Sequence, residues 1–347
     1  MTNLSQPETT ERVASILEIL SAAVEQAAVA AHTWVGKGDS HAADAAATAA
    51  MRSVFSKAPF GVHVVIGEGE RDSAPMLARG ERLGAFSAFR GNAEGPEADL
   101  VLDCAVDPLD GTSLLKNGLP GAITVAVLAD AGGIVGAPDF YMEKLSCPAA
   151  ARGAVSLSQS PRARVLALAS ALDKPVGHLR IAVQDRPRHH GLVAELRDAG
   201  AIVHLFGEGD VTIGLEAAQG GGAYDALMGI GAAPEGVITA AAVRCLGGHF
   251  QGRFVYNPAE VQSGLIGPCA QSNRERLMAA GILDPDAIFD RDELVSAKNV
   301  FVALCGITGG PYIAGVDVSS GTGLVTTSYI MRADQVGQTV RTTHHSF

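Results

Sequence analysis

The pattern of apolar and polar positions predicts a regular alternation of strands, loops and helices in the second half of the chain. Short runs rich in apolar and β-branched residues are typical of strands, and the longer segments between them favour helices. The predicted strands are 181–183, 201–206 and 224–228, and the helices that follow them are 191–199, 211–219 and 236–246. Such alternation implies a parallel sheet with right-handed crossovers.

The loops that follow these three strands carry charged residues. Open α/β sheets bind ligands at the carboxyl ends of their parallel strands. The first loop holds Arg186 and Arg188, the second Glu208 and Asp210, and the third Glu235. Two arginines in one turn suit a phosphate group. Glu235 either turns toward a metal or is an ordinary acid that favours the helix dipole at a helix start, and the local sequence leaves both open.

An acidic loop follows a strand-like segment in the first half of the chain. Residues 62–66 are rich in β-branched side chains and run into G-E-G-E-R-D at 67–72. The loop has the outline of a dinucleotide-binding fingerprint, but Asp72 stands in place of its third glycine and the carboxylates would repel a pyrophosphate. The glycines instead let the backbone turn so that Glu68 and Glu70 can converge on a cation.

The most informative stretch is D-C-A-V-D-P-L-D-G-T at 103–112. It places three carboxylates within eight residues at the end of an apolar segment, in what reads as a tight turn. Carboxylates this close repel one another unless a cation lies between them, and Mg²⁺ or Mn²⁺ is the usual cation. Two of the carboxylates, Asp107 and Asp110, flank Pro108 and Leu109, while Gly111 and Thr112 suit a phosphate oxygen. The alternative is an acidic surface turn.

These segments, taken together, resemble the class II fructose-1,6-bisphosphatases of bacteria, within the lithium-sensitive, metal-dependent phosphatase superfamily that includes inositol monophosphatase. The matching motifs stand in family order between residue 36 and about residue 340. They are G-D at 38–39 with Asp44, V-I-G-E-G-E-R-D-S-A-P-M-L at 65–77, A-V-D-P-L-D-G-T at 105–112, A-P-D-F-Y-M-E-K-L at 137–145, R-P-R-H at 186–189, G-E-G-D at 207–210 and G-A-A-P-E-G-V at 231–237.

The resemblance implies a role for individual residues. The expected metal ligands are Asp44 and Glu68 for one divalent ion, and Asp107, Asp110 and Glu235 for a second. The expected catalytic residues are Thr112, which would align the attacking water, with Glu70 and Asp72. The expected substrate-binding residues are Asp110, Gly111, Thr112, Tyr141, Arg186, Pro187, Arg188, Glu208, Gly209, Asp210 and Ala232.

Some positions depart from the family pattern or have a second reading. Arg186 stands where better-known members have Lys, Glu208 where they have Asp, Asp110 where some have Glu, and Ala232 where Gly is frequent. These departures leave the choice of sugar open. Asp44 lies on a predicted Ala-rich helix from Ser40 to Arg52, and the local sequence favours a solvated helix residue there. For Tyr141 the local sequence fits a core aromatic as well as it fits a site residue. His189 and His190 either contact phosphate or begin a solvated helix.

The implied fold is a layered α/β sugar-phosphatase fold, with two sheets sandwiched by helices in the order α-β-α-β-α. A chain of 347 residues exceeds the size at which single cores usually split. We therefore expect a metal-binding half over 1–150 and a second half over 151–347 that supplies the sugar-binding and phosphate-binding loops and one metal ligand.

The implied reaction is hydrolysis of the 1-phosphate of fructose 1,6-bisphosphate to fructose 6-phosphate, in carbohydrate metabolism and gluconeogenesis. Three alternatives remain. The first is the same chemistry on sedoheptulose 1,7-bisphosphate, alone or in a dual-substrate enzyme. The second is an inositol- or nucleotide-phosphate phosphatase, against which the G-E-G-E and R-P-R motifs argue. The third is a sugar-phosphate sensor without catalysis, which would have no use for a full set of acidic ligands.

Composition bears on partners and compartment. The net charge of −11 argues against nucleic acids and anionic membranes as partners. Five scattered cysteines without a C-x-x-C pair favour reduced thiols in a cytoplasmic protein. For Cys104 a buried strand residue is the favoured interpretation, and a redox sensor is the alternative. The N-terminus lacks a signal-peptide pattern, and no membrane span is expected. The family suggests a dimer or tetramer.

Overall fold

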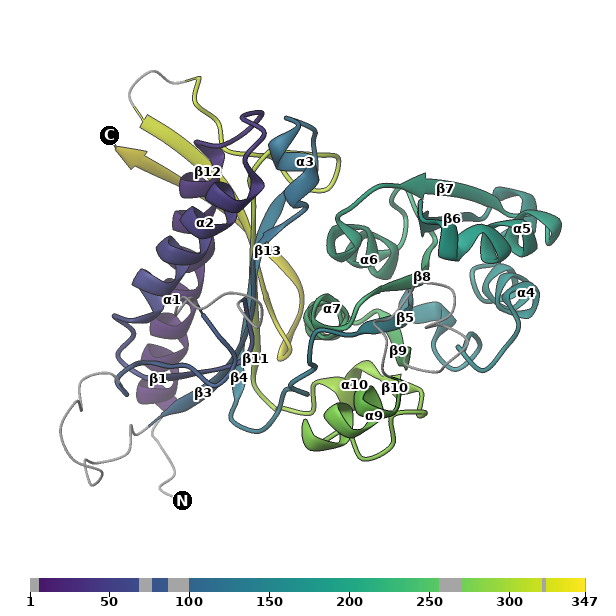
Figure 1. The fold of residues 1–347 in the computed structure, drawn as a ribbon, viewed down its shortest axis with the longest axis horizontal. Helices are drawn as coiled ribbons and strands as arrows, with labels where there is room; N and C mark the ends of the chain where they lie inside the picture. Colours follow the sequence, from purple (N-terminus) through teal and green to yellow (C-terminus); the bar gives the residue numbers. More distant parts are fainter. Residues whose placement is uncertain (1–5, 69–76, 87–99, 256–269, 320–322, 347) are drawn as a thin grey trace. The chain divides into compact units, whose positions relative to one another are not determined.

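The chain forms two compact units, each built on its own sheet. The computed structural model describes residues 6–68, 77–86, 100–255, 270–319 and 323–346. The first unit comprises residues 1–132 and 297–347, and the second comprises residues 133–296. In Figure 1 the first unit takes the purple, blue and yellow ends of the colour scale, and the second takes the teal and green middle.

The first unit contains a seven-stranded mixed sheet in the order β13-β12-β11-β4-β3-β1-β2. β1 and β3 are parallel, and the other neighbouring strands are antiparallel. The elements of this unit are α1 (Gln6–His32), α2 (Ser40–Phe55), β1 (Gly61–Ile66), β2 (Arg82–Gly84), β3 (Val101–Asp110), α3 (Thr112–Lys116), β4 (Ile123–Asp130), β11 (Val300–Gly306), β12 (Gly323–Arg332) and β13 (Gln335–Ser346).

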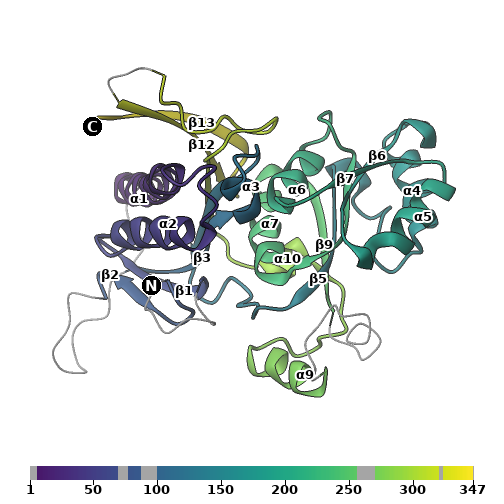
Figure 2. The same ribbon diagram turned by 45° about the horizontal axis from the view of Figure 1, so that its top comes forward.

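Helices α1 and α2 lie side by side over one face of this sheet (Figures 1 and 2). Leu20 and Val24 of α1, and Met51 and Phe55 of α2, are completely buried in the core that the helices share with the strands. The buried positions recur every three to four residues, as expected for helices that bury one stripe.

Helix α1 contains a stretch, Thr10–His32, that is long and apolar enough to cross a membrane by length and composition alone. A core helix of a soluble protein passes the same test, and α1 packs its buried stripe against the sheet of its own unit. Glu18 and Glu25 interrupt the apolar run of this helix. Length and composition alone are weak evidence for a span, so the expectation of no membrane span stays a prediction.

The second unit contains a six-stranded mixed sheet in the order β10-β9-β5-β8-β6-β7. Its elements are β5 (Tyr141–Cys147), η1 (Ala149–Ala151), α4 (Pro161–Ala171), η2 (Val176–His178), β6 (Arg180–Gln184), η3 (Pro187–His189), α5 (His190–Asp198), β7 (Ile202–Phe206), α6 (Asp210–Gln219), β8 (Ala226–Ala232), α7 (Ala233–Leu246), β9 (His249–Val255), α9 (Ala270–Ala279), β10 (Phe289–Asp290) and α10 (Arg291–Leu294).

Strand β6 lies between β7 and β8 and is parallel to both, which confirms the parallel arrangement predicted from the sequence. Strand β5 is antiparallel to β8 and β9. Helices α6 and α7 contact each other and the β5 and β8 strands. Helices α4 and α5 pack through Val165, Leu168, Val193 and Leu196 against a core shared with Leu145 of β5.

Two mixed, helix-flanked sheets confirm the predicted α/β layered class. The division of the chain differs from the expected boundary near residue 150. Strand β5 begins at Tyr141 and belongs to the second sheet, and the segment from residue 297 returns to the first unit. It returns because β11 pairs along its whole length with β4, a contact between segments far apart in sequence.

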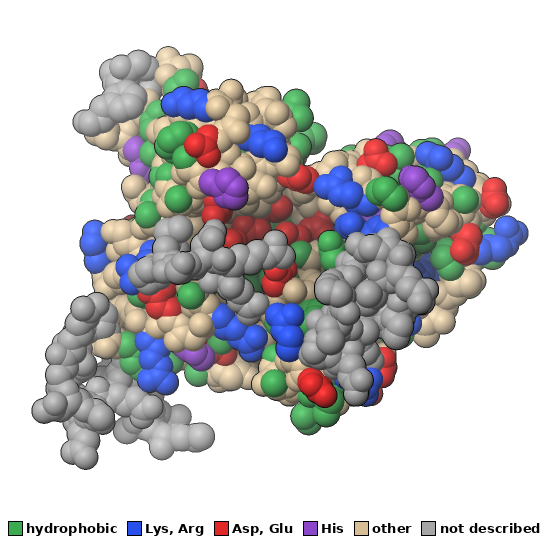
Figure 3. Space-filling view, viewed as in Figure 1, with side chains coloured by type: hydrophobic (Ala, Val, Ile, Leu, Met, Phe, Trp, Pro, Cys, Tyr) green, Lys and Arg blue, Asp and Glu red, His purple; other side chains and the backbone are tan. Residues whose placement is uncertain are grey.

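The surface carries both signs of charge. The face shown in Figure 3 carries both Lys and Arg side chains and Asp and Glu side chains. The net charge of −11 is therefore a property of the whole chain and does not fix the local field at any one site.

Candidate active site

In the first unit, the acidic segments meet because β1 and β3 are parallel. Ile66, the last residue of β1, pairs with Ala105 of β3. The chain beyond Ile66 therefore leads Glu68 to the same edge of the sheet as the acidic end of β3. The glycine before Glu68 is required by packing, since a Cβ at Gly67 would collide with the backbone oxygen of Leu77.

The segment from Asp107 to Asp110 is the irregular end of a strand, where the sequence predicted a tight turn. β3 continues to Asp110, and its pairing with β4 shifts register between Asp107 and Asp110. Pro108 lies in this irregularity, because it has no N–H to donate to a neighbouring strand. The amide of Leu109 donates to Oδ1 of Asp107 over 3.0 Å. The chain turns one residue later at Gly111, whose φ of 85° is in the left-handed region.

Four of the five expected metal ligands converge at this edge. The pKa of Asp107 is raised well above its ordinary value, first by burial and then by the negative charges of Asp110, Glu68 and Asp44. Like charges influence one another in this way only when they lie close together in a poorly solvated place. The carboxylates from helix α2, from the loop after β1 and from the end of β3 therefore form one group within the first unit.

Asp44 is a member of this group and is not the solvated helix residue that its local sequence favours. It lies in the first half of α2 and is only partly exposed. Burial raises the pKa of its carboxyl group, and the nearby His41 acts in the opposite direction. The helix is positioned at its start by Asp39, whose side chain accepts a hydrogen bond from Ala42 N over 3.0 Å.

This donor set fits a hard divalent cation. The four carboxylates supply oxygen donors, and their mutual repulsion would be relieved by a positive ion. Asp103, the first carboxylate of the D-C-A-V-D-P-L-D run, accepts a hydrogen bond from Gly132 N over 2.7 Å and contacts His63, so it serves the fold. Glu70 and Asp72 lie outside the described residues.

Thr112 is the first residue of α3 and follows Asp110 and Gly111 directly. It is half-buried. A Cβ on Gly111 would lie 3.1 Å from the Leu114 side chain and 3.3 Å from the Ala122 backbone, so the turn that presents Thr112 is closely packed.

Apart from Asp110, Gly111 and Thr112, which belong to the first unit, the expected substrate-binding residues lie in the second unit. The strands β6, β7 and β8 are parallel, so their carboxyl ends share one edge of the sheet. The residues at this edge are Arg186, Pro187 and Arg188 after β6, Glu208, Gly209 and Asp210 after β7, Ala232 at the end of β8 and Glu235 after it. Tyr141, the first residue of β5, pairs with Ala232.

Arg188 is held firmly within this group. Its Nε and Nη2 atoms donate to the carbonyl oxygen of Ile230 over 2.9 and 2.7 Å, and Nη2 also donates to Oε1 of Gln184 over 2.6 Å. Its guanidinium lies over the ring of Tyr141, 5.2 Å from the ring centre. Burial lowers the pKa of Arg188, while Tyr141, Asp210 and Glu235 oppose that effect. The arginine is therefore a cation held in place near the carboxyl end of β8.

Arg186 is placed differently. It is partly exposed, and its Nη2 atom lies 3.9 Å from Oε1 of Glu208. A second nitrogen, Nη1, donates to the carbonyl oxygen of Asp185 over 2.9 Å. Glu208 is thus close enough to offset the charge of Arg186, which the sequence did not anticipate. Pro187, between the two arginines, is exposed.

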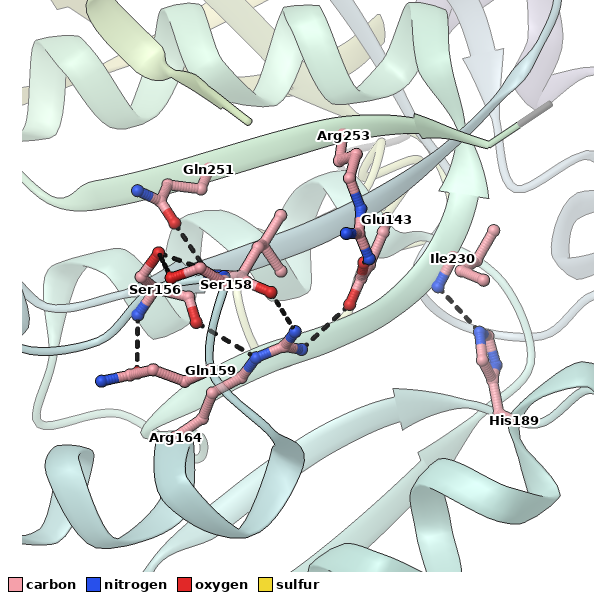
Figure 4. Close-up of polar contacts among 10 residues, drawn as sticks. Glu143, Ser156, Ser158, Gln159, Arg164, His189, Ile230, Gln251 and Arg253 are labelled. Carbon is pink, nitrogen blue, oxygen red and sulfur yellow. Dashed lines mark hydrogen bonds and ion pairs between the residues drawn. The ribbon is translucent and has the colours of Figure 1, made fainter. Parts of the chain in front are cut away.

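His189 has a structural role that neither sequence reading anticipated. Its ring is buried, with Nδ1 2.6 Å from the carbonyl oxygen of Gln184. Nε2 lies 2.7 Å from the amide nitrogen of Ile230 (Figure 4). Because the amide can only donate, Nε2 is the acceptor and Nδ1 carries the proton. Burial lowers the pKa of His189. Arg188 is hydrogen-bonded to the carbonyl oxygen of Ile230 and His189 to its amide, so the two side chains together hold the R-P-R loop against β8.

Lys144 is a member of the site that sequence reasoning missed. Its side chain is only 2% exposed, and its Nζ atom lies 2.6 Å from Oδ2 of Asp210 and 3.7 Å from Oε2 of Glu235. The available signal was a lone lysine in the strand-like end of A-P-D-F-Y-M-E-K-L, because a buried lysine is rare unless it is paired.

Comparisons with known proteins identify the family of the chain. Residues 15–346 match the family described as "Bacterial fructose-1,6-bisphosphatase, glpX-encoded". The chain is 45% identical over 331 residues to a protein of Nostoc sp. (strain PCC 7120), covering 94% of this chain and 95% of that protein. It is 46% identical over 303 residues to a protein of Synechocystis sp. (strain PCC 6803), covering 86% and 87%. Both relatives are named D-fructose 1,6-bisphosphatase class 2/sedoheptulose 1,7-bisphosphatase.

The raised pKa of Asp107 predicts how the metal-free protein responds to pH and to Asp107→Asn. A carboxyl group whose pKa is higher in the folded state stabilises the fold below its unfolded pKa, and this contribution is lost as pH rises through the folded pKa. At pH 8 the substitution should therefore raise the melting temperature of the metal-free protein, by about 2–4 °C for each kcal/mol relieved. Asn keeps the oxygen that accepts from Leu109 N.

Thermal unfolding in the presence of a chelator, at pH 5 and pH 8, measures this effect. The gain from Asp107→Asn should be larger at pH 8, and added Mn²⁺ should stabilise the variant less than the wild type. Asp103→Asn is the control, because Asp103 is buried but engaged with Gly132. A variant that is less stable than the wild type at pH 8 without metal would show that the acidic group is not under repulsion.

Proposed function

The chain belongs to the bacterial class 2 fructose-1,6-bisphosphatase family, and from this membership we propose that it hydrolyses the 1-phosphate of fructose 1,6-bisphosphate to fructose 6-phosphate and phosphate. It is a phosphatase of carbohydrate metabolism. The observation that carries the proposal is the match over residues 15–346, which includes every residue expected in the site. The group of carboxylates in the first unit is the independent structural support.

We propose that the carboxylates hold Mg²⁺ or Mn²⁺ at two sites. Asp44 and Glu68 are the proposed ligands of one ion, and Asp107, Asp110 and Glu235 those of the other. Divalent cations in such a site activate a water and stabilise the charge on the transferred phosphoryl group. Family membership supports metal dependence, and the choice between the two metals is left to experiment.

The side chains have distinct tasks in this scheme. Thr112 orients the attacking water, and the backbone of Gly111 and Thr112 contacts the phosphate. We also propose Glu70 and Asp72 as catalytic residues. The phosphate group is transferred to water, so no covalent link to Thr112 is formed.

The group of residues in the second unit is proposed to bind the sugar and the second phosphate. Arg186 and Arg188 supply positive charge, and Glu208 and Asp210 supply acceptors for sugar hydroxyls. The fixed orientation of Arg188, bonded to Ile230, supports a pre-organised contact, since a side chain already held in place loses less entropy on binding.

Sedoheptulose 1,7-bisphosphate is the second candidate substrate. The names of the relatives from Nostoc and Synechocystis include this activity, at 45% and 46% identity. The same hydrolytic chemistry acts on both sugars, so one site can serve both.

We also propose that the protein is a cytoplasmic homo-oligomer, a dimer or a tetramer, that acts on small molecules, without nucleic-acid or membrane partners. In the described part of the chain, Cys104, Cys147, Cys245 and Cys305 are buried and form no disulfide, as expected for reduced thiols. Burial, with a smaller effect of Asp103, raises the pKa of Cys104 far above its ordinary range, which argues against a redox-sensing role.

Phosphate release from a substrate panel tests the proposed function. The purified protein is assayed with Mn²⁺ or Mg²⁺ on fructose 1,6-bisphosphate, sedoheptulose 1,7-bisphosphate, fructose 6-phosphate and inositol 1-phosphate. We expect metal-dependent release from one or both bisphosphates and little from the monophosphates. Preferential release from inositol phosphate would replace the proposal with the second alternative of the sequence analysis.

The Thr112 hydroxyl should act mainly in the transition state. Thr112→Ala should therefore lower kcat and kcat/KM together, by about 100-fold for a group that aligns the nucleophile, and Thr112→Ser should be milder. Steady-state kinetics on fructose 1,6-bisphosphate measures both constants. A raised KM at unchanged kcat in the Ala variant would make Thr112 a binding residue only.

Arg186 should recognise the phosphate that is not cleaved. Arg186→Ala removes a charge-assisted contact worth about 1.5–3 kcal/mol, so KM for fructose 1,6-bisphosphate should rise about 10-fold or more, while weak hydrolysis of a monophosphate should be unaffected. Arg186 is the cleaner test, because Arg188→Ala would also release Ile230. Arg197→Ala, an exposed arginine of α5, is the control. Equal losses on both substrates would argue against recognition of the second phosphate.

A further inference from the structure

A buried lysine is the least expected feature of the second unit. Lys144 occupies the middle of β5, a strand with neighbours on both sides. Its ammonium group faces two carboxylates from different elements: Asp210, the first residue of α6, at 2.6 Å, and Glu235, in the first turn of α7, at 3.7 Å. Both acids are expected members of the active site.

The local sequence leaves room for this side chain. A Cβ on Gly231 of β8 would lie 3.0 Å from Nζ of Lys144 and would press on Oδ2 of Asp210. A Cβ on Gly236 of α7 would lie 3.2 Å from Cε of Lys144 and 2.6 Å from Sδ of Met142. Two glycines of the G-A-A-P-E-G-V motif therefore shape the space in which the lysine meets Asp210.

Neighbouring residues of β5 serve different partners. Glu143, the residue before Lys144, accepts from Nη1 of Arg164 on α4 over 2.9 Å and pairs with Arg253 of β9 at 2.5 Å (Figure 4). Arg164 also donates to the backbone oxygen of Leu157, so Glu143 ties the strand to α4 and its preceding loop. Lys144 makes the corresponding contact to the other side, where α6 and α7 begin.

Stability alone is a poor explanation for the Lys144–Asp210 pair. A buried ion pair often contributes no more to folding than apolar residues of the same volume. Oδ1 of Asp210 is buried and accepts no hydrogen bond from the residues that the structure describes, while Oδ2 is bonded to Lys144. A buried acceptor without a partner is rare in native proteins, and a sugar hydroxyl would satisfy it.

We propose that Lys144 is a positioning residue for substrate binding, which holds the carboxylate of Asp210 so that it can accept a hydrogen bond from a hydroxyl of the sugar. The inference rests on the proposed function, because it requires a sugar phosphate as the ligand. The contact to Asp210 is shorter than the contact to Glu235 by 1.1 Å (3.7 less 2.6), so the main effect concerns the sugar and not the metal.

Lys144→Met tests the proposal, since Met has a similar length and no charge. KM for fructose 1,6-bisphosphate and the dissociation constant of fructose 6-phosphate, measured by calorimetry, should both rise about 10-fold or more, as expected when a buried hydrogen-bonded contact is lost. The value of kcat should change much less, and so should the Mn²⁺ concentration for half-maximal stabilisation in thermal unfolding.

Lys174→Met is the matched control. Lys174 also contacts a buried carboxylate, Asp225, with Nζ 2.9 and 2.7 Å from its two oxygens, but neither residue belongs to the expected site. This variant should lose stability and keep the wild-type KM. If it raised KM as much as Lys144→Met does, the effect would be a general loss of stability and the proposal would be overturned.

Two further variants keep the proposal testable if Lys144→Met folds poorly. Lys144→Met with Asp210→Asn removes both charges, so it should recover stability without recovering the affinity for fructose 6-phosphate. Gly231→Ala keeps both charges but crowds the pair, and it should raise KM in the same direction. Restored affinity in the double variant, or an unchanged KM in Gly231→Ala, would contradict the assignment.

The outcomes also separate this inference from the proposed function. Wild-type protein that releases no phosphate from any sugar bisphosphate would contradict the proposed function. If the wild type is active and Lys144→Met has an unchanged KM, only the proposed role of Lys144 is contradicted. If the variant loses only kcat and needs more Mn²⁺, that role is also contradicted, and the lysine would act through Glu235 instead of Asp210.

Discussion

The repulsion among four carboxylates is the constraint on which the first unit depends. Asp44, Glu68, Asp107 and Asp110 arrive from a helix, a loop and a strand end, and burial prevents water from screening them fully. A sequence selected only for stability would not gather them. The parallel pairing of β1 with β3 and the glycine turn after Asp110 serve to bring these charges together, and a divalent cation is the simplest group that would balance them.

In the second unit, by contrast, the charged side chains of the site have partners within the unit. Lys144 contacts Asp210, Arg186 lies near Glu208, and Arg188 is bonded to the backbone of β8. These contacts hold the side chains in place before any ligand arrives, which reduces the entropy lost on binding. His189 contributes to the same order, because its neutral ring accepts from one peptide group and donates to another.

Local patterns predicted much of this arrangement. The β6–β8 region follows from its strand-loop-helix alternation, and the acidic segments were recognisable from their spacing and family resemblance. The return of β11 to the first sheet was not predictable, because its pairing with β4 joins distant segments that carry no local signal. At Pro108 the sequence predicts a turn and the structure has an irregular strand end, because both favour the same residues.

Side-chain partners were harder to predict than positions. Nothing near Lys144 in the sequence indicates that Asp210 is its partner, and the buried state of His189 depends on the path of β8 beside it. The place of Asp44 was also not predictable from its neighbours in sequence. It is a helix residue with an ordinary local context, and it joins the acidic group only because α2 packs on the sheet.

Calorimetric titration of the metal-free protein with Mn²⁺ tests the central claim most directly. Because burial and repulsion raise the pKa of Asp107, the metal-free group takes up a proton at a higher pH than an ordinary carboxyl group does, and Mn²⁺ binding in that pH range must release the proton. The measured heat should then differ between two buffers of different ionisation enthalpy, by an amount that corresponds to a fraction of a proton up to about one proton. Absence of binding, or equal heats in both buffers, would contradict the account.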